Sequence, residues 1–306
     1  MATNQISWIA ADWGTTNLRI WLMSASNDIM AHRQSDKGMG KLKPAEFEAA
    51  LLDLLDDCLT PDAETPVVIC GMAGSRQGWV EAPYITTPCT PPGLADATHV
   101  TGTDRRITVS ILPGVKQIDP ADVMRGEETQ IAGFLASEPS FTGIICLPGT
   151  HTKWVHVSNG TIASFSTFMS GELFDLLSRQ SVLRHGVQQS EINTEAFSSA
   201  IMDIKKAPQN FAAELFGIRA KGLIAGLTPS AAFSRLSGLV IGAELSALDL
   251  TAAPDGNVII LGADRLADAY ATGLQALGLS SRKTSVETAT LHGLILAHSQ
   301  LKETET

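Results

Sequence analysis

The sequence contains few cysteines, four in 306 residues, and none of them lies in a C-x-x-C pair. No cluster of histidines stands beside them. Zinc sites need closely spaced ligands and disulfide frameworks need paired thiols, so the pattern argues against both. We therefore expect buried free thiols in a reducing cytoplasm.

A run of basic residues is also absent. The formal net charge is −10, and charged residues make up 18% of the chain. Nucleic acids and anionic membranes attract clustered positive charge, so neither is expected as a partner. An acidic protein can still bind a small anion through individual Arg, Lys and backbone N–H groups. The sequence therefore favours small-molecule partners.

No apolar stretch approaches the ~18 residues of a membrane-spanning helix, and the N-terminus lacks the basic segment of a secretion signal. Apolar residues make up 44% of the chain, enough for one large or two ordinary domains. These features predict a soluble cytoplasmic protein.

Two common phosphate-binding motifs are missing as well. The sequence has neither G-x-x-x-x-G-K-[ST] nor a G-x-G-x-x-G that opens a helix after a strand. A P-loop enzyme or a Rossmann dehydrogenase would need one of them. Any phosphate site in this chain must therefore be built differently.

The segment IAADWGTTNLRIWLM, near the N-terminus, places a carboxylate, a glycine and two hydroxyls between two apolar runs. Glycine lets the backbone approach a phosphate, so the N–H groups of Gly14, Thr15 and Thr16 can point at its oxygens, and the threonine hydroxyls add donors. Asp12 can hold a magnesium ion directly or through water. The alternative is a turn that the polar side chains merely stabilise.

A second turn of the same kind follows about half a chain later. Gly149, Thr150 and His151 come directly after another short apolar run. Two matching turns predict a duplicated β-meander, one in each half of the chain. Leu147 stands where Asp12 stands in the first unit, so we expect a metal to bind through the first unit alone.

Helical and strand patterns fill the rest of the chain. Helices are predicted over 44–59, 126–137, 172–181, 211–226, 230–250, 264–277 and 287–301. Strands are predicted over 6–11, 18–23, 67–69, 143–147, 153–157, 161–168 and 258–261. The segment 81–93 has four prolines, which predict an extended coil that covers other elements without joining a sheet. The fold class is α/β with mixed sheets.

The D-x-G-T-T turn, the second G-T turn and the late segment VIILGADRLADAY together resemble the sugar kinase, heat-shock ATPase and actin superfamily. This resemblance implies two ribonuclease-H-like domains with an ATP cleft between them, the actin-like ATPase fold. The two turns would hold the phosphates, and Gly262 and Ala263 would lie against the adenosine. An ordinary strand-to-helix connection is the alternative for these two residues.

The same resemblance implies the domain organisation. We expect an N-terminal ribonuclease-H-like domain with the sugar-acid site over residues 1–138. A C-terminal ribonuclease-H-like domain with the adenosine site should cover residues 139–284. Residues 285–306 should form a C-terminal helix that packs back on the N-terminal domain.

Further blocks narrow the resemblance to the 2-dehydro-3-deoxygalactonokinase family, across the whole chain. These blocks are GMAGSRQGWVEAPYITTP (71–88), MRGEETQI (124–131), LPGTHTKW (147–154), FMSGELFDLL (168–177) and GLVIGAEL (238–245). The family implies a sugar-acid kinase that phosphorylates the terminal (C6) hydroxyl of 2-dehydro-3-deoxy-D-galactonate with ATP and Mg²⁺, in galactonate catabolism.

A catalytic carboxylate is expected in the R-G-E-E segment. Related sugar kinases carry a G-D-Q-like segment at the corresponding place, with Asp as the base. Here that position holds Glu127, and Glu128 beside it is a rival. Both glutamates could instead only favour the N-terminus of a helix electrostatically.

The substrate carboxylate needs a cationic partner. Arg76 and Arg125 are the candidates, because Arg makes paired hydrogen bonds to carboxylates. Ser75 and Trp79 accompany Arg76 in a loop that resembles the sugar-binding loop of other sugar kinases. Trp79 could instead belong to the core, and Arg125 could instead contact the phosphates.

Two other functions stay open at the level of sequence. One is a kinase of the same fold for another sugar or sugar acid. The other is a non-catalytic ATP-binding, actin-like protein. The sequence also leaves open whether the chain forms a homodimer.

Overall fold

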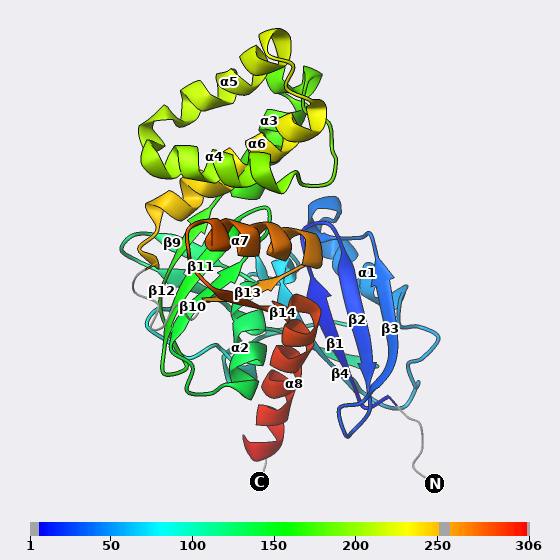
Figure 1. The fold of residues 1–306 in the computed structure, drawn as a ribbon. Helices are drawn as coiled ribbons and strands as arrows, with labels where there is room; N and C mark the ends of the chain where they lie inside the picture. The colour runs from blue at the N-terminus through cyan, green and yellow to red at the C-terminus, as the bar shows by residue number, and fades with distance from the viewer. Residues whose placement is uncertain (1–5, 251–257, 305–306) are drawn as a thin grey trace. The chain divides into compact units, whose positions relative to one another are not determined.

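A computed structural model describes residues 6–250 and 258–304 of the chain (Figure 1). The chain divides into two compact units, and each has its own main sheet. Unit 1 comprises Met1–Phe141, Ser158–Ser164 and Val286–Thr306, and unit 2 comprises Thr142–Val157 and Phe165–Ser285.

The main sheet of unit 1 has six strands in the order β3-β2-β1-β4-β7-β6. Strands β1, β2 and β3 form an antiparallel meander, β4 and β7 continue it in parallel with β1, and β6 pairs antiparallel with β7. The bounds are β1 (Trp8–Trp13), β2 (Leu18–Met23), β3 (Ile29–Ser35), β4 (Thr65–Gly71), β6 (Thr98–Val100) and β7 (Ile107–Ile111). The meander predicted in the first half of the chain is confirmed.

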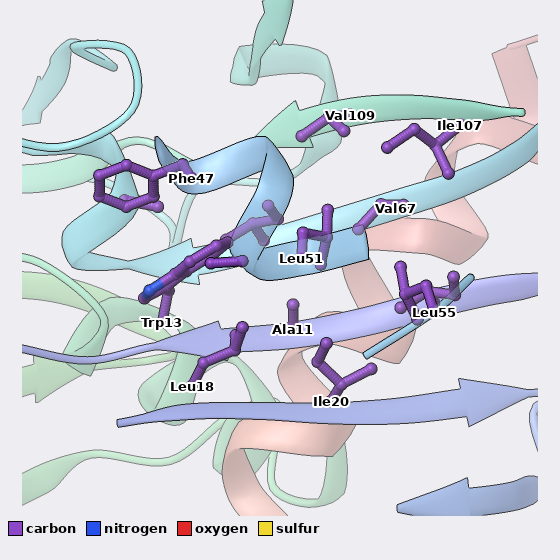
Figure 2. Packing of buried hydrophobic residues seen from close by; sticks show 14 of the residues in the cluster. Ala11, Trp13, Leu18, Ile20, Phe47, Leu51, Leu55, Val67, Ile107 and Val109 are labelled. Atoms are coloured by element: carbon purple, nitrogen blue, oxygen red, sulfur yellow. The ribbon is translucent and has the colours of Figure 1, made fainter. Parts of the chain in front are cut away.

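Alternate residues of β1 point to opposite faces of this sheet, and both faces are covered. Ala11 and Trp13 pack against the side chains of α1 (Phe47–Leu52), as Figure 2 shows. Trp8 lies on the other face, in a cluster that includes side chains of α8 (Val286–Thr304). A strand covered on both faces needs apolar residues at nearly every position. Asp12 is therefore an exception that needs an explanation.

The helix predicted over 44–59 is shorter in the structure. A single 3-10 turn (Pro44–Glu46) leads into α1, and residues 53–58 continue as turns that keep Leu55 buried. Three aspartates lie between positions 53 and 57. The negative end of the helix dipole disfavours acidic side chains at a C-terminus, so the regular helix ends early while its apolar face continues.

Helices α2 (Glu127–Ser137) and α8 contact each other through their backbones. A Cβ atom on Gly133 would lie only 1.8 Å from the Ala289 carbonyl oxygen, and one on Gly293 would lie 2.0 Å from the Thr129 carbonyl oxygen. Real Cβ atoms do not come this close to a backbone atom. The C-terminal helix therefore packs on unit 1 through glycines.

The segment 81–93 was predicted to stay outside any sheet, and that prediction is wrong. Strand β5 (Tyr84–Thr86) pairs in parallel with β8 (Gly114–Gln117), and β8 pairs antiparallel with β9 (Asp122–Met124). The four prolines of the segment lie outside these three residues of β5, so they remove no donor from the ladder.

The main sheet associated with unit 2 has five strands, which repeat the order of the first five strands of the sheet in unit 1. Its order is β12-β11-β10-β13-β14, with β11 antiparallel to β10 and with β13 parallel to both β10 and β14. The bounds are β10 (Gly143–Leu147), β11 (Thr152–Ser158), β12 (Thr161–Phe168), β13 (Val258–Gly262) and β14 (Ser281–Ser285). Asn159 and Gly160 have φ of 47° and 73°, as a tight hairpin turn requires. The second predicted meander is confirmed.

The helices of unit 2 include one that the sequence reading left out. Their bounds are α3 (Ser170–Arg179), α4 (Thr194–Lys206), α5 (Phe211–Ile224), α6 (Pro229–Ala247) and α7 (Asp264–Ala276). The unpredicted helix is α4, which packs against α6. Its signal was present, because Asn193 caps it and Phe197, Ile201 and Ile204 are buried at helical spacing.

Short 3-10 turns join several of these elements. Besides Pro44–Glu46, they are Met39–Lys41, Met72–Gly74, Leu94–Asp96, Val182–His185 and Pro208–Asn210. In the part of the chain that the structure describes, no helix is both long enough and apolar enough to span a bilayer.

Replacing Gly133 with alanine should separate α2 from α8. The new methyl group would meet backbone atoms that cannot rotate away, so we expect Gly133→Ala to lower the free energy of unfolding by about 1–3 kcal/mol. Gly222→Ala is the control, because a Cβ there has no neighbouring atom within 4 Å and Gly222 lies inside helix α5. It should be neutral or stabilising by up to about 1 kcal/mol. Denaturant unfolding of both variants checks this, and a Gly133→Ala protein as stable as wild type would contradict the packing.

Candidate active site

The turn between β1 and β2 is held by main-chain hydrogen bonds. Gly14 N donates to Asn17 O at 2.9 Å, which closes the turn. The 3-10 turn Met39–Lys41 lies against it, because Met39 N donates to Gly14 O at 3.0 Å and Gly40 N donates to Thr15 O at 2.9 Å. The turn is therefore rigid without using the hydroxyl of Thr15.

Polar residues surround this first turn. Thr15 and Thr16 are exposed, and the Thr16 hydroxyl accepts a hydrogen bond from the Asn17 side chain at 3.0 Å. One pocket is lined by Asp12, Gly14, Thr16, Asn17, Arg19, Gln34, Ser35 and Asp36. A pocket with backbone N–H groups, hydroxyls and an arginine can hold phosphate oxygens.

Asp12 points toward this pocket with one oxygen already engaged. Its Oδ2 accepts from Arg19 Nη2 at 2.5 Å, and its Oδ1 lies 3.9 Å from the Cys70 thiol. Within the described ranges, no three His, Cys, Asp or Glu side chains gather closely enough to hold a metal. A single carboxylate suits Mg²⁺, which takes most of its ligands from water and phosphates. Asp12 fits the role of the single protein carboxylate at such a site.

A close glycine contact brings α2 to this end of the sheet. Gly71, the last residue of β4, has φ of 90°, and a Cβ there would lie 2.7 Å from Trp13 O and 3.4 Å from Asp12 Oδ1. Gly126 has φ of 104°, and a Cβ on it would lie 3.3 Å from the Gly71 Cα. Both positions require glycine. The first residues of α2 therefore lie beside the end of β1.

The two glutamates at the start of α2 have different surroundings. The half-buried Glu127 accepts a hydrogen bond from Arg125 N at 2.9 Å. Glu128 is 1% exposed, and both of its oxygens lie 2.8 Å from Gly126 N. Burial, together with the nearby charge of Glu127, raises the pKa of Glu128 to about 8. Glu128 therefore accepts a backbone hydrogen bond at the start of α2, and Glu127 is the more accessible carboxylate.

Arg125 is buried with unsatisfied donors. Its Nη2 donates to Ala82 O at 2.7 Å, and its guanidinium lies 4.2 Å from the centre of the Tyr84 ring. Its Nε and Nη1, and the buried Ser75 hydroxyl, find no hydrogen-bond partner among the residues that the structure describes. A Cβ on Gly74 would lie 2.9 Å from Nη1. Gly74, the residue before Ser75, is therefore in contact with the guanidinium. An anion can accept hydrogen bonds from buried, unpaired donors of this kind.

The other two residues of the predicted substrate loop differ from Arg125. Arg76 is exposed. Trp79 is half-buried, and its ring lies 6.1 Å from the rings of both Trp13 and Phe47. Trp79 therefore packs against the first core, which is the alternative that the sequence left open for it.

The turn between β10 and β11 is supported by the start of α3. A Cβ on Gly171 would lie 2.3 Å from Gly149 O, and Glu172 N donates to Thr150 O at 3.0 Å. His151 Nε2 lies 2.6 Å from a carboxylate oxygen of Glu172. The main chain of this second turn is therefore fixed by contacts with a helix N-terminus.

A pocket of about 270 Å³ lies beside the second turn. Gly149 and Ala263, both predicted to bind ATP, line it together with Ser170, Gly171, Phe174, Ile192, Phe233, Ser237, Val240, Ile241, Arg265, Leu266, Ala269 and Tyr270. Gly262 ends β13 beside it, where a Cβ would lie 3.2 Å from Pro148. Mostly apolar walls with a few polar groups suit a flat heterocycle.

The structure brings the predicted site residues into two groups. Unit 1 gathers the first turn, Asp12, Glu127 and Arg125 near the same end of its sheet. In unit 2, Gly149 and Ala263 line one pocket, and the predicted residues Thr150, His151 and Gly262 are not among its lining residues. Sequence reasoning missed Phe233 and Arg265, whose guanidinium lies 6.0 Å from the Phe233 ring. No motif marks Phe233, because it belongs to an apolar helix that reads as core.

Comparison with known proteins supports a single family. The family model described as 2-keto-3-deoxy-galactonokinase matches residues 12–297. A relative from Rhizobium meliloti (strain 1021), named a probable 2-dehydro-3-deoxygalactonokinase, is 38% identical over 94% of this chain and 95% of its own length. The 2-dehydro-3-deoxygalactonokinase of Escherichia coli (strain K12) is 33% identical over 94% of this chain and 96% of its own length.

Solved structures agree with the fold. A crystal structure from Sinorhizobium meliloti that bears the provisional name of a 2-dehydro-3-deoxygalactonokinase has a TM-score of 0.88 and 34% identity over 96% of this chain and 99% of that one. The activator of 2-hydroxyisocaproyl-CoA dehydratase from Clostridium difficile, with bound ADPNP, has a TM-score of 0.51 at 12% identity over 97% of this chain and 96% of that one, a likeness of fold alone. The predicted α/β class with two ribonuclease-H-like sheets is confirmed. The resemblance suggested by the sequence blocks is confirmed as well, and the chain belongs to the 2-keto-3-deoxy-galactonokinase family.

Proposed function

We propose that this chain is an ATP-dependent kinase that phosphorylates the terminal (C6) hydroxyl of 2-dehydro-3-deoxy-D-galactonate, in galactonate catabolism. Family membership across most of the chain supports the reaction class. The observation that carries the choice of an acid substrate is the buried guanidinium of Arg125, which has two unpaired nitrogens and contacts Gly74, the residue before the unpaired Ser75. An anionic group of the substrate would satisfy these donors.

ATP binding is assigned to residues of both units. The main chain of Gly14, Thr15 and Thr16 would donate to phosphate oxygens, and so would Gly149, Thr150 and His151. The adenosine would occupy the pocket beside Gly262 and Ala263. Glycines at both turns leave room for the phosphates to approach the backbone.

The substrate acid is assigned to unit 1. Arg125 and Ser75 would bind its carboxylate. Arg76 is kept as a second candidate for that carboxylate, and Trp79 as a residue that contacts the carbon chain from the edge of the core. The exposure of Arg76 makes it the weaker of the two cations, because a buried charge pair is much stronger than an exposed one.

Glu127 is proposed as the general base. As the terminal hydroxyl oxygen attacks the γ-phosphorus, its proton passes to the Glu127 carboxylate, the bond from the γ-phosphorus to the bridging oxygen breaks, and ADP leaves. Asp12 would hold Mg²⁺ through one oxygen, while Arg19 fixes the other. A bound Mg²⁺ supplies positive charge to the phosphates.

A cytoplasmic location is part of the proposal. The reaction consumes ATP, which is made and kept in the cytoplasm. In the described structure the four cysteines are free thiols, as a reducing compartment allows.

An ADP-release assay tests the proposal directly. Purified protein with ATP and Mg²⁺ should release ADP with 2-dehydro-3-deoxy-D-galactonate and give a product phosphorylated at C6. The gluco epimer, N-acetylglucosamine and a pentulose serve as comparison substrates. ADP release that is faster with a neutral sugar than with any 2-oxo acid would overturn the choice of substrate class.

Arg125→Met should raise the KM for the acid and leave the KM for ATP nearly unchanged. The variant keeps the length of the side chain and removes the charge. Losing one partner of a buried charge pair costs about 2–5 kcal/mol, so kcat/KM for the acid should fall by about 30-fold or more. Arg76→Met is the matched comparison and should have a small effect. If Arg76→Met is the damaging variant, Arg76 binds the carboxylate instead.

Glu127→Gln should reduce kcat by about 10²–10⁴-fold, because it keeps the shape of the side chain and removes the base. Glu128→Gln should be mild by comparison, because the Glu128 carboxyl is directed to the backbone of Gly126, the residue just before its own helix. Steady-state kinetics of both variants at saturating substrates distinguish the two glutamates. If Glu128→Gln is the more damaging variant, Glu128 is the base and not Glu127.

Glu128→Gln should also flatten the dependence of stability on pH. The pKa of Glu128 rises from its ordinary 4.5 to about 8 in the folded protein. Between these values the folded chain keeps a proton that the unfolded chain has lost, so the free energy of unfolding of wild type should fall as pH rises from about 5 to about 8. Urea unfolding at several pH values compares the two proteins. An identical slope for both would show that Glu128 does not titrate in this window.

A further inference from the structure

A buried carboxylate on α6 connects three other elements of unit 2. Glu244 is 2% exposed, and its oxygens accept hydrogen bonds from Ser170 Oγ on α3, Trp154 Nε1 on β11 and Tyr270 Oη on α7. The bond from Tyr270 measures 2.9 Å. Burial raises the pKa of Glu244, and the three donated hydrogen bonds oppose that rise by stabilising the charged form.

One branch of this network leads to the second turn through side chains. The Tyr270 hydroxyl lies 2.8 Å from the hydroxyl of Thr152, a residue that is completely buried. The Thr152 hydroxyl in turn lies 3.5 Å from Gly149 N, at the long end of the range for a hydrogen bond. A chain of contacts therefore runs from Glu244 to the backbone of the turn.

The other branch leads to the same turn through the backbone of α3. Ser170 is the first residue of that helix, and its hydroxyl is held by Glu244. The next residue, Gly171, is in such close contact with Gly149 O that a Cβ would lie 2.3 Å from it. A shift of Ser170 would therefore move the support on which the turn rests.

We infer that Glu244 is a positioning residue for ATP, which holds the second turn and the start of α3 in the arrangement that binds the phosphates. Glu244 does not line the pocket beside the turn, whereas Gly149, Ser170 and Tyr270 do. Its effect on the nucleotide is therefore indirect. The inference rests on the proposed function, in which Gly149, Thr150 and His151 contact the phosphates.

An apolar residue of similar volume could fill the place of Glu244 inside α6. It would leave the Trp154, Ser170 and Tyr270 donors buried without an acceptor, and each unpaired buried donor costs about 1–3 kcal/mol. The side chains would then relax toward other partners. Two of the three donors line the pocket, so this relaxation would alter the nucleotide site as well as stability.

Glu244→Gln and Thr152→Val test the two ends of the first branch. Glu244→Gln keeps the volume and replaces one acceptor oxygen by an NH₂ group. Thr152→Val keeps the shape and removes the hydroxyl that faces Gly149, and Thr152→Ser restores that hydroxyl. Arg235→Met is the control for stability, because Arg235 lies on the same helix and is buried against Asp203 and Glu214, away from the pocket.

The measurements are KM for ATP, KM for the sugar acid, kcat, and the rise in Tm that ATP causes. We expect Glu244→Gln and Thr152→Val to raise KM for ATP by about tenfold or more and to reduce the ATP-induced rise in Tm. KM for the sugar acid should change by less than about twofold. Thr152→Ser should resemble wild type. Arg235→Met should lower Tm and leave both KM values in place.

Two results would overturn the inference. One is a wild-type KM for ATP in both Glu244→Gln and Thr152→Val, with only a lowered Tm as in Arg235→Met. The other is an equal rise in KM for ATP in Thr152→Val and Thr152→Ser. If Glu244→Gln does not fold, the two Thr152 variants decide. If ATP does not raise the Tm of the wild-type protein, the proposed function is wrong, and the role of Glu244 fails with it.

Discussion

A backbone contact between Gly71 and Gly126 fixes where helix α2 begins relative to the main sheet of unit 1. Neither residue carries a Cβ atom, both have positive φ, and a side chain at either position would meet the neighbouring backbone. The contact brings the first turn of α2 to the end of β1, beside Asp12. The same contact sets the positions of Arg125 and Glu127, which lie on either side of Gly126. Larger residues at these two glycines would separate Glu127, the proposed base, from Asp12, the proposed ligand of Mg²⁺.

The two units stabilise their strand-to-strand turns in different ways. Each has a turn between antiparallel strands whose main chain is held by contacts with another segment of the same unit. In unit 1 the main chain of Met39 and Gly40 holds the turn. In unit 2 the start of α3 and a buried network centred on Glu244 hold it. A turn held by main-chain hydrogen bonds tolerates many different side chains at the supporting positions. A turn held by a network of side chains depends on the identity of a few residues.

Charge distribution explains how an acidic protein can bind an acid. The net charge of −10 predicts repulsion of anions on average. Arg125, the proposed partner of the acid, would overcome this repulsion locally because it is buried, where a charge interacts more strongly than at the surface. The unpaired Ser75 hydroxyl lies in the same part of unit 1. Under the proposed assignment, one desolvated cation matters more for substrate choice than the balance of surface charges.

Much of this architecture could be predicted from the sequence, and the failures have physical causes. Both meanders, both glycine turns and the Gly262–Ala263 connection depend on local patterns of apolar residues and glycine. The pairing of β5 was missed because proline counts say little about which N–H groups remain free. The choice between Arg76 and Arg125 was left open because burial is decided by distant segments. Glu244 carries no local signal, since its partners come from three other elements.

The central claim is that the acid lies between Arg125 and Glu127 in unit 1. A crystal structure with 2-dehydro-3-deoxy-D-galactonate, Mg²⁺ and a non-hydrolysable ATP analogue would test it most directly. The measurement is the distance from the terminal hydroxyl oxygen of the acid to the Glu127 carboxylate. We expect a hydrogen bond of about 2.6–3.2 Å, directly or through one water, with the acid carboxylate on the Arg125 guanidinium. A terminal hydroxyl that contacts another carboxylate, with Arg125 still unpaired, would contradict the assignment.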